Sequence, residues 1–339
     1  MSTTQFKQWT LASTSGLDSL QLSKGTLPSV LGENEILVKF MAVSLNYRDW
    51  IILNGRNPFP IAKDVVPGSD GAGEVIRVGS QVSEFKPGDR VVTTFFQSHD
   101  SGPLSLEIIQ SSLGALQDGP FREYGIYPQS GLIHAPPNLS WSESSTLSCA
   151  GLTAWNALSG LRTLQPGDTV LIQGTGGVSC FALQFARAAG ATVIATTSSQ
   201  VKAEHLKRLG ATHILNYRDD PRWGETAKSL TANNIGVDIV IQIGGAGSIR
   251  QSLCAVRLEG VISLVGNLGF GDDGDSPATV AEISQRLATV KSIGVGHKES
   301  FREMNRFIET HQITPILDPR HFRLEDLKNA FQYMASPAL

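Results

Sequence analysis

One short stretch restricts the fold more than any other part of the chain. An apolar run, TVLIQG (169–174), leads directly into the turn Gly174-Thr175-Gly176-Gly177-Val178-Ser179. Apolar side chains then recur on one face of a helical stretch, at Val178, Phe181, Ala182, Phe185, Ala186 and Ala189. A buried strand, a glycine turn and a helix in this order predict a βαβ unit of a parallel sheet.

The same alternation continues after this unit. A helix is expected from Val201 to Leu209, and Gly210 should end it. Four further strands are predicted, at ATVIATT (191–197), HILNY (213–217), VDIVIQI (237–243) and GVISLVG (260–266). Strands that alternate with helices predict an α/β domain with a doubly wound parallel sheet of the Rossmann type.

The first part of the chain has a different pattern. Turns such as Lys86-Pro87-Gly88-Asp89 separate short strands, which predicts an irregular antiparallel β-barrel. The strands are EILVKFMAV (35–43), GAGEVIRVG (71–79) and DRVVTTFF (89–96).

Residues 97–118 are interpreted as an insertion near the substrate mouth with an apolar-faced helical element, or as a simple surface helix. GFGDDGDSPATV (269–280) is expected to be a loop that returns from the sheet to the rest of the protein. We expect a catalytic domain at 1–128, a nucleotide-binding domain at 129–268 and a return to the catalytic domain at 269–339.

Composition excludes several classes of function. The 339 residues allow two domains, and 41% hydrophobic with 17% charged residues is typical of a soluble globular protein. A net charge of −3 gives no basis for binding nucleic acid, and no apolar stretch is long enough to span a membrane. The polar start MSTTQFKQWT lacks the pattern of a secretion signal, and three scattered cysteines form no disulfide framework. We therefore expect a cytoplasmic protein.

The glycine turn is the predicted pyrophosphate site. Gly174, Gly176 and Gly177 would let the backbone approach the ligand, and the N–H groups of the following helix, from Val178 onward, would face it. Ser179 replaces the third glycine, so the packing of the helix on the strand must accommodate a hydroxyl. The alternative is a glycine-rich turn that binds no ligand.

The end of the second strand of the parallel sheet, 191–197, distinguishes a site for NADPH from one for NADH. Sites for NADH usually carry an acid there that accepts hydrogen bonds from the ribose 2′-hydroxyl. This strand ends in Thr-Thr-Ser198-Ser199-Gln, with Lys202 close behind and no acid before Glu204. Hydroxyls and a cation suit a 2′-phosphate, and Arg218, which follows Tyr217 after the next strand, could add to the pocket. Alternatively, Lys202 is only a solvated helix residue. The sequence favours NADP(H).

Three motifs together resemble the medium-chain dehydrogenase/reductase superfamily. They are PGSDGAGEVIRVGSQVSEFKPGDRV (67–91), CAGLTAWNAL (149–158) and the glycine turn, and the likeness covers nearly the whole chain. Leu45-Asn46-Tyr47-Arg48-Asp49 is similar to the zinc-free quinone oxidoreductase-like branch, which includes proteins often labelled zinc-type alcohol dehydrogenase-like. The resemblance implies a GroES-like catalytic domain, with the cofactor across the carboxyl ends of the parallel strands and the nicotinamide in the interdomain cleft.

The same resemblance provides a test for zinc. Zinc-dependent members place a Cys, a His and a further Cys where this chain has Asn46, Ser69 and Cys149. A catalytic zinc needs three protein ligands, and only Cys149 could serve. The lobe that binds a structural zinc in relatives would fall at 93–120, which contains no cysteine. We expect no metal, and Cys149 is interpreted as a small buried residue rather than a ligand or nucleophile.

The resemblance also implies the other site residues. Asn46 and Tyr47 would lie beside the nicotinamide as the catalytic pair, where an amide or phenol could stabilise an oxyanion. The alternative is that Asn46 orients the nicotinamide carboxamide while Tyr47 packs the pocket wall. Arg48 and Asp49 are expected to form a structural ion pair or turn contact. The further cofactor contacts assigned are Thr153, Tyr217, Gly244 and Asn267.

Two departures from the family pattern bear on function. Asn57, in Gly55-Arg56-Asn57-Pro58, stands where enoyl-thioester reductases carry a proton-donating Tyr, so Tyr47 or water would have to donate instead. The chain also stops at Met334-Ala-Ser-Pro-Ala-Leu339, where relatives continue into a final strand. Either the barrel closes differently, or a partner chain covers an edge.

Three functions follow as hypotheses. The favoured one is an NADPH-dependent oxidoreductase that transfers a hydride to an enone, quinone or aldehyde. The others are an NADP-binding protein with little turnover, such as a sensor or structural partner, and a zinc alcohol dehydrogenase, which the ligand count opposes. We expect a small-molecule substrate and a homodimer.

Overall fold

The computed structural model describes residues 4–265 and 278–336. The chain divides into two compact units, which are described separately. The first contains Met1–Cys149 and His297–Leu339, and the second contains Ala150–Gly296. No helix in the described residues is long and apolar enough to cross a lipid bilayer.

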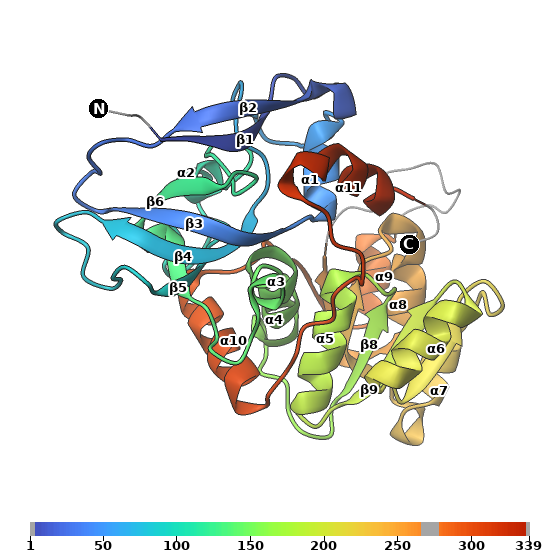
Figure 1. Cartoon of the computed structure of the whole chain (residues 1–339). Coiled ribbons are helices and arrows are strands. Elements are labelled where there is room, and N and C mark those ends of the chain that lie inside the picture. Colours follow the sequence, from blue (N-terminus) through green and yellow to red (C-terminus); the bar gives the residue numbers. More distant parts are fainter. Residues whose placement is uncertain (1–3, 266–277, 337–339) are drawn as a thin grey trace. The chain divides into compact units, whose positions relative to one another are not determined.

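The first unit is built on a five-stranded antiparallel sheet with the order β6-β3-β4-β5-β7 (Figure 1). Its strands are β3 (Glu35–Ser44), β4 (Asp70–Val78), β5 (Arg90–Thr93), β6 (Tyr124–Pro128) and β7 (Leu132–His134). A hairpin of β1 (Gln5–Leu11) and β2 (Leu20–Thr26) forms a second, two-stranded sheet. The strands predicted at 35–43 and 71–79 are confirmed, and the strand at 89–96 is shorter than expected. The predicted barrel is confirmed as an open half-barrel.

Helices complete the core of this unit. They are α1 (Tyr47–Leu53), α2 (Leu106–Gln110), α3 (Trp141–Ser144), α10 (Lys298–Thr310) and α11 (Leu327–Met334). Figure 1 shows α11, near the end of the chain, beside α1, and the rings of Phe331 and Trp50 lie 6.4 Å apart. Phe331 also packs edge-on against Phe121, at 6.3 Å. The C-terminal segment therefore contributes to the same core as the first seventy residues.

The second unit contains the predicted doubly wound parallel sheet, with the order β10-β9-β8-β11-β12-β13. The strands are β8 (Thr169–Gln173), β9 (Thr192–Thr197), β10 (His213–Asn216), β11 (Val237–Gln242), β12 (Val256–Leu264) and β13 (Thr289–Ser292). The helices are α4 (Leu152–Ser159), α5 (Gly177–Ala188), α6 (Gln200–Leu209), α7 (Trp223–Ser229), α8 (Ile249–Ala255) and α9 (Val280–Gln285). α6 ends at Gly210, whose φ of +94° is the left-handed conformation that glycine adopts readily.

The limits of the two units differ from the expected domain boundaries at 128 and 268. Residues 129–149 belong to the first unit, and the second unit continues to Gly296 because β13 pairs in parallel with β12. β13 gave little signal in the sequence, since it has four residues and only Val290 is apolar. Most of the predicted return loop, 269–280, lies outside the described residues.

Candidate functional site

The turn between β8 and α5 leaves its backbone open. Gly174 has a φ of +76°, which side chains disfavour. A Cβ atom added to Gly176 would meet nothing within 4 Å. Gly176 is also the N-cap residue of the twelve-residue helix α5, and it has no side chain to cap the first N–H groups. Those groups and the positive end of the helix dipole suit a phosphate.

Ser179 is accommodated below this turn. It is 1% exposed, and its Oγ donates a hydrogen bond of 2.8 Å to the carbonyl oxygen of Gln173. The hydroxyl therefore ties the first turn of α5 to the end of β8.

The carboxyl ends of β9 and β10 lie side by side, and the residues expected around a 2′-phosphate follow these two ends. Thr197 and Asn216 are partners in the parallel register, and the Tyr217 N–H donates to the Thr197 carbonyl at 3.0 Å. Ser199 caps α6, where its Oγ accepts from the Lys202 N–H at 3.3 Å. Ser198, which precedes this cap, is half-buried, as is Lys202.

The acids after β10 are engaged within their own turn. Asp219 accepts a hydrogen bond from the Asn216 side chain, and Asp220 accepts one of 2.6 Å from the Thr226 hydroxyl. No carboxylate belongs to the strand end at Thr197, Ser198, Ser199 and Gln200.

The remaining predicted cofactor contacts in the second unit lie on three different segments. Thr153 is buried in α4, Val178 is half-buried in the first turn of α5, and Gly244 is exposed just after β11. Asn267 lies outside the described residues.

In the first unit, α1 begins at the predicted catalytic pair. Asn46 is the N-cap residue, and its N–H donates to Asp49 Oδ2 at 2.8 Å. Arg48 donates to Asp49 Oδ1 at 3.1 Å, which confirms the predicted ion pair. Tyr47 is 50% exposed, whereas Asp49 is buried. The start of the helix therefore fixes the backbone of the pair while the phenol stays accessible.

The sequence did not reveal the role of Asp70, at the start of β4. It is 0% exposed, and it accepts hydrogen bonds from the Ser69 hydroxyl at 2.6 Å and the Cys149 N–H at 3.0 Å. Burial raises the pKa of the Asp70 carboxyl from 3.8 to about 7, although the hydrogen bonds from Ser69 and Cys149 lower it. Asp49 raises the pKa further, and Asn46 lowers it. An Asp directly after Ser69 in an apolar strand start was the available signal.

The Asn46 amide lies at the edge of this cluster. Its Nδ2 atom is buried and makes no hydrogen bond of standard geometry with the described residues. The Asn46 side chain still lowers the pKa of Asp70 through a hydrogen bond, which the geometry makes a weak one. An oxygen atom of a ligand could take the place of Asp70 as the acceptor.

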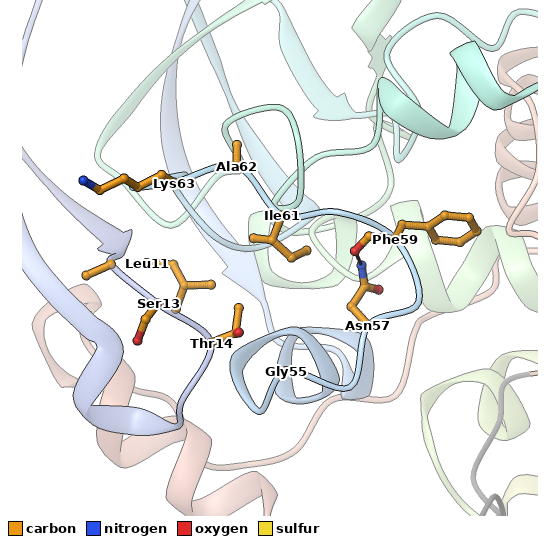
Figure 2. A pocket seen from close by; sticks show the side chains of 10 residues that line it. Leu11, Ser13, Thr14, Gly55, Asn57, Phe59, Ile61, Ala62 and Lys63 are labelled. Atoms are coloured by element: carbon orange, nitrogen blue, oxygen red, sulfur yellow. Dashed lines mark hydrogen bonds between the residues drawn. The ribbon is translucent and has the colours of Figure 1, made fainter.

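A cavity of about 440 Å³ opens at the other end of α1 (Figure 2). Its lining includes Thr14, Gly55, Asn57 and Phe59. The Asn57 amide is turned onto its own loop, where Nδ2 donates to the Phe59 carbonyl at 2.7 Å. Neither Asn46 nor Tyr47 lines the cavity, because the seven-residue helix α1, which begins at Tyr47, separates them from Gly55.

Comparisons with known proteins agree over nearly the whole chain. Residues 32–137 match the alcohol dehydrogenase GroES-like domain family, and residues 177–310 match the zinc-binding dehydrogenase family. The chain is 43% identical over 329 residues to the zinc-type alcohol dehydrogenase-like protein C1773.06c of Schizosaccharomyces pombe, covering 96% of this chain and 94% of that protein.

The chain belongs to the medium-chain dehydrogenase/reductase superfamily. It is therefore an oxidoreductase of a superfamily that typically uses a nicotinamide cofactor.

Solved structures of this superfamily share the fold. A Sinorhizobium meliloti 1021 protein named as an alcohol dehydrogenase has a TM-score of 0.90 and 35% identity, with 98% of this chain and 96% of that chain covered. The quinone oxidoreductase of Escherichia coli, complexed with NADPH, has a TM-score of 0.78 and 23% identity, covering 97% and 96%. At that identity the second likeness shows the fold alone.

The zinc of other superfamily members does not fit the residues of this chain. Ser69 and Asn46 are neutral, and the Ser69 hydroxyl donates a hydrogen bond to Asp70. Cys149 is half-buried, and burial raises the pKa of its thiol well above 9.0, which opposes the thiolate that zinc requires. Among the described residues, no three His, Cys, Asp or Glu side chains are grouped to hold a metal ion.

Proposed function

We propose that this chain is an NADPH-dependent reductase that transfers a hydride to an activated carbonyl or alkene, as in an enone, quinone or aldehyde, without catalytic zinc. The observation that carries the proposal is the end of β9. Ser198, Ser199 and Lys202 follow β9 at the point where it ends beside β10, and residues 197–200 include no acid that would repel a 2′-phosphate.

Residues of the second unit would hold the cofactor. The N–H groups at the start of α5, after Gly174 and Gly176, would bind the pyrophosphate, and the β9 end would bind the adenosine ribose. By resemblance, Thr153 and Gly244 would contact the rest of the cofactor. When bound, NADPH supplies the hydride.

Residues of the first unit would act on the substrate oxygen. The Asn46 amide, whose Nδ2 atom makes no hydrogen bond of standard geometry with the described residues, can donate to that oxygen, and the accessible Tyr47 phenol can donate a proton. Asp49 holds the backbone of Asn46, so the donor is positioned before substrate arrives. In the alternative, Asn46 orients the nicotinamide carboxamide, and Tyr47 packs the pocket wall.

Optical assays of NADPH oxidation with enones, quinones and aldehydes test this function. Activity in protein shown by metal analysis to lack zinc supports the proposal. Oxidation of alcohols at a rate that rises with the zinc content of the protein would instead establish an alcohol dehydrogenase.

A second candidate is an NADP-binding protein with little turnover. It is favoured by Asn57, whose amide is committed to the Phe59 carbonyl and supplies no acid. Tight NADPH binding without turnover on the whole panel would support it. A homodimer and a cytoplasmic location stay predictions.

A further inference from the structure

Two buried carboxamides lie under the loops that follow β8 and β11. Gln173 is the last residue of β8, and Gln242 is the last residue of β11. They are 5% and 2% exposed, and Gln173 Nε2 donates to Gln242 Oε1 at 2.7 Å. Gln173 Nε2 also donates to Ser252 Oγ of α8 at 2.9 Å, and the Ser252 hydroxyl donates to Gln242 Oε1. The two strand ends are thus joined by a closed side-chain network.

This network holds the backbone of the turn after β11. Gln173 Oε1 accepts from two successive N–H groups, Ile243 at 3.0 Å and Gly244 at 2.8 Å. Gln242 Nε2 donates to the Gly245 carbonyl at 2.8 Å. Gly245 has a φ of +71°, so the turn keeps a conformation that other residues disfavour. Every polar atom of the Gln173 amide is used in this arrangement.

Gln173 also reaches the glycine turn on its other side. Its carbonyl oxygen accepts from Ser179 Oγ at 2.8 Å, in the first turn of α5. One residue therefore contacts both the loop proposed for the pyrophosphate and the loop after β11.

The strand order indicates which part of a dinucleotide each loop meets. β9 and β11 flank β8 on opposite sides. A dinucleotide bound across the carboxyl ends has its pyrophosphate at the β8–α5 turn and its adenosine ribose at β9. The other half of the molecule then extends over β11, toward Ile243 and Gly244.

We propose that Gln173 is a positioning residue for the nicotinamide half of the cofactor, because its side chain fixes the Ile243–Gly245 turn. The inference rests on the proposed function. It predicts that binding of the adenosine half does not depend on Gln173. A ligand that carries only the adenosine half can therefore serve as a control.

The experiment compares Gln173→Met with Gln251→Met by calorimetry. Gln251 Oε1 also accepts a backbone hydrogen bond, from Gly224 at 2.9 Å between α7 and α8, so its variant loses the same chemistry elsewhere in the unit. The probes are NADPH and adenosine 2′,5′-bisphosphate. Gln173→Met should bind NADPH about tenfold more weakly, because two N–H groups lose their acceptor, and should bind the bisphosphate as wild type does. Gln251→Met should bind both normally.

A readout without cofactor guards against a misfolded variant. Hydrogen exchange of the Ile243 and Gly244 amides should be faster in Gln173→Met than in wild type. Ser252→Ala, which removes one hydroxyl of the network, should weaken NADPH binding about threefold and leave the bisphosphate unaffected. If wild type prefers NADH, the same comparison is made with NADH and AMP.

Two results would overturn the role of Gln173 and leave the proposed function standing. One is normal NADPH binding by both Gln173→Met and Ser252→Ala, and the other is an equal loss of affinity for NADPH and for the bisphosphate. Wild-type protein that binds neither dinucleotide would overturn the proposed function and this inference with it.

Discussion

The two units build their candidate sites from different materials. In the second unit, the proposed pyrophosphate site is mainly backbone, and the turn from Gly174 to Ser179 is one continuous stretch of sequence. In the first unit, neighbouring side chains and the distant backbone N–H of Cys149 surround two buried carboxyls, Asp49 and Asp70. An open glycine turn has room for a new side chain, but a negative charge there would repel a bound phosphate. Buried carboxyls have shifted pKa values, so their ionisation depends on pH. Substitutions in the second unit should therefore change the affinity for the cofactor. Substitutions in the first unit should change turnover and the pH dependence of stability.

The largest expected effect comes from Asp70→Asn. The Asp70 carboxyl keeps its proton to about pH 7 in the folded chain and loses it near 3.8 when unfolded, so stability should fall as pH rises through that window. Between pH 5 and 8, wild type should lose about 3 kcal/mol of unfolding free energy that the variant keeps. Urea unfolding at both pH values measures this difference.

Asp18→Asn is the matched control, since Asp18 is an exposed carboxylate of the same unit. It should follow the wild-type pH dependence. Parallel pH profiles for wild type and Asp70→Asn would show that burial does not govern this site.

Gly176→Asp tests the backbone site. The position has room for a side chain, and Asp is a favoured N-cap residue, so thermal stability should hold or rise. The added charge faces the pyrophosphate position, and NADPH binding should weaken about 100-fold. Calorimetry measures the affinity. The neutral variant Gly176→Asn should lose much less, and an equal loss in both variants would refute the electrostatic explanation.

Ser198→Asp restores the acid that this strand end lacks. The preference for NADPH over NADH should fall by about tenfold, because the carboxylate repels a 2′-phosphate and accepts from a 2′-hydroxyl. Dissociation constants for both cofactors, with Ser198→Asn as the uncharged control, measure the change. An unaltered preference would place the ribose elsewhere.

Tyr47→Phe should affect turnover with little effect on stability. Removing an exposed phenol should change the unfolding free energy by less than about 0.5 kcal/mol. If Tyr47 donates the proton, kcat should fall about tenfold while the affinity for NADPH stays constant. Tyr124→Phe, in β6, is the control. Unchanged kcat in Tyr47→Phe would favour the packing role.

The contrast between the units also explains what the sequence predicted. Five strands of the parallel sheet and the helices α5 and α6 were predicted from their apolar patterns, and the glycine turn lies between β8 and α5. Helices α4, α7, α8 and α9 were not predicted. β13 was missed because four mostly polar residues carry no such pattern, although pairing with β12 is enough to form it.

The buried clusters were less accessible to sequence reasoning. No local pattern places Cys149 next to Asp70, 79 residues away. The family resemblance places Cys149 near Ser69, but the hydrogen bond of 3.0 Å from the Cys149 N–H to the Asp70 carboxylate is seen only in the folded chain. Gln173 and Gln242 each appear as polar ends of apolar strands, and their mutual hydrogen bond depends on the strand order. Local patterns predict elements, while contacts between remote side chains follow from topology.

The most direct test of the central claim is calorimetric titration of the wild-type protein with NADPH and with NADH. An adenosine 2′-phosphate held by Ser198, Ser199 and Lys202 predicts that NADPH binds at least about tenfold more tightly. Tighter binding of NADH would contradict that assignment.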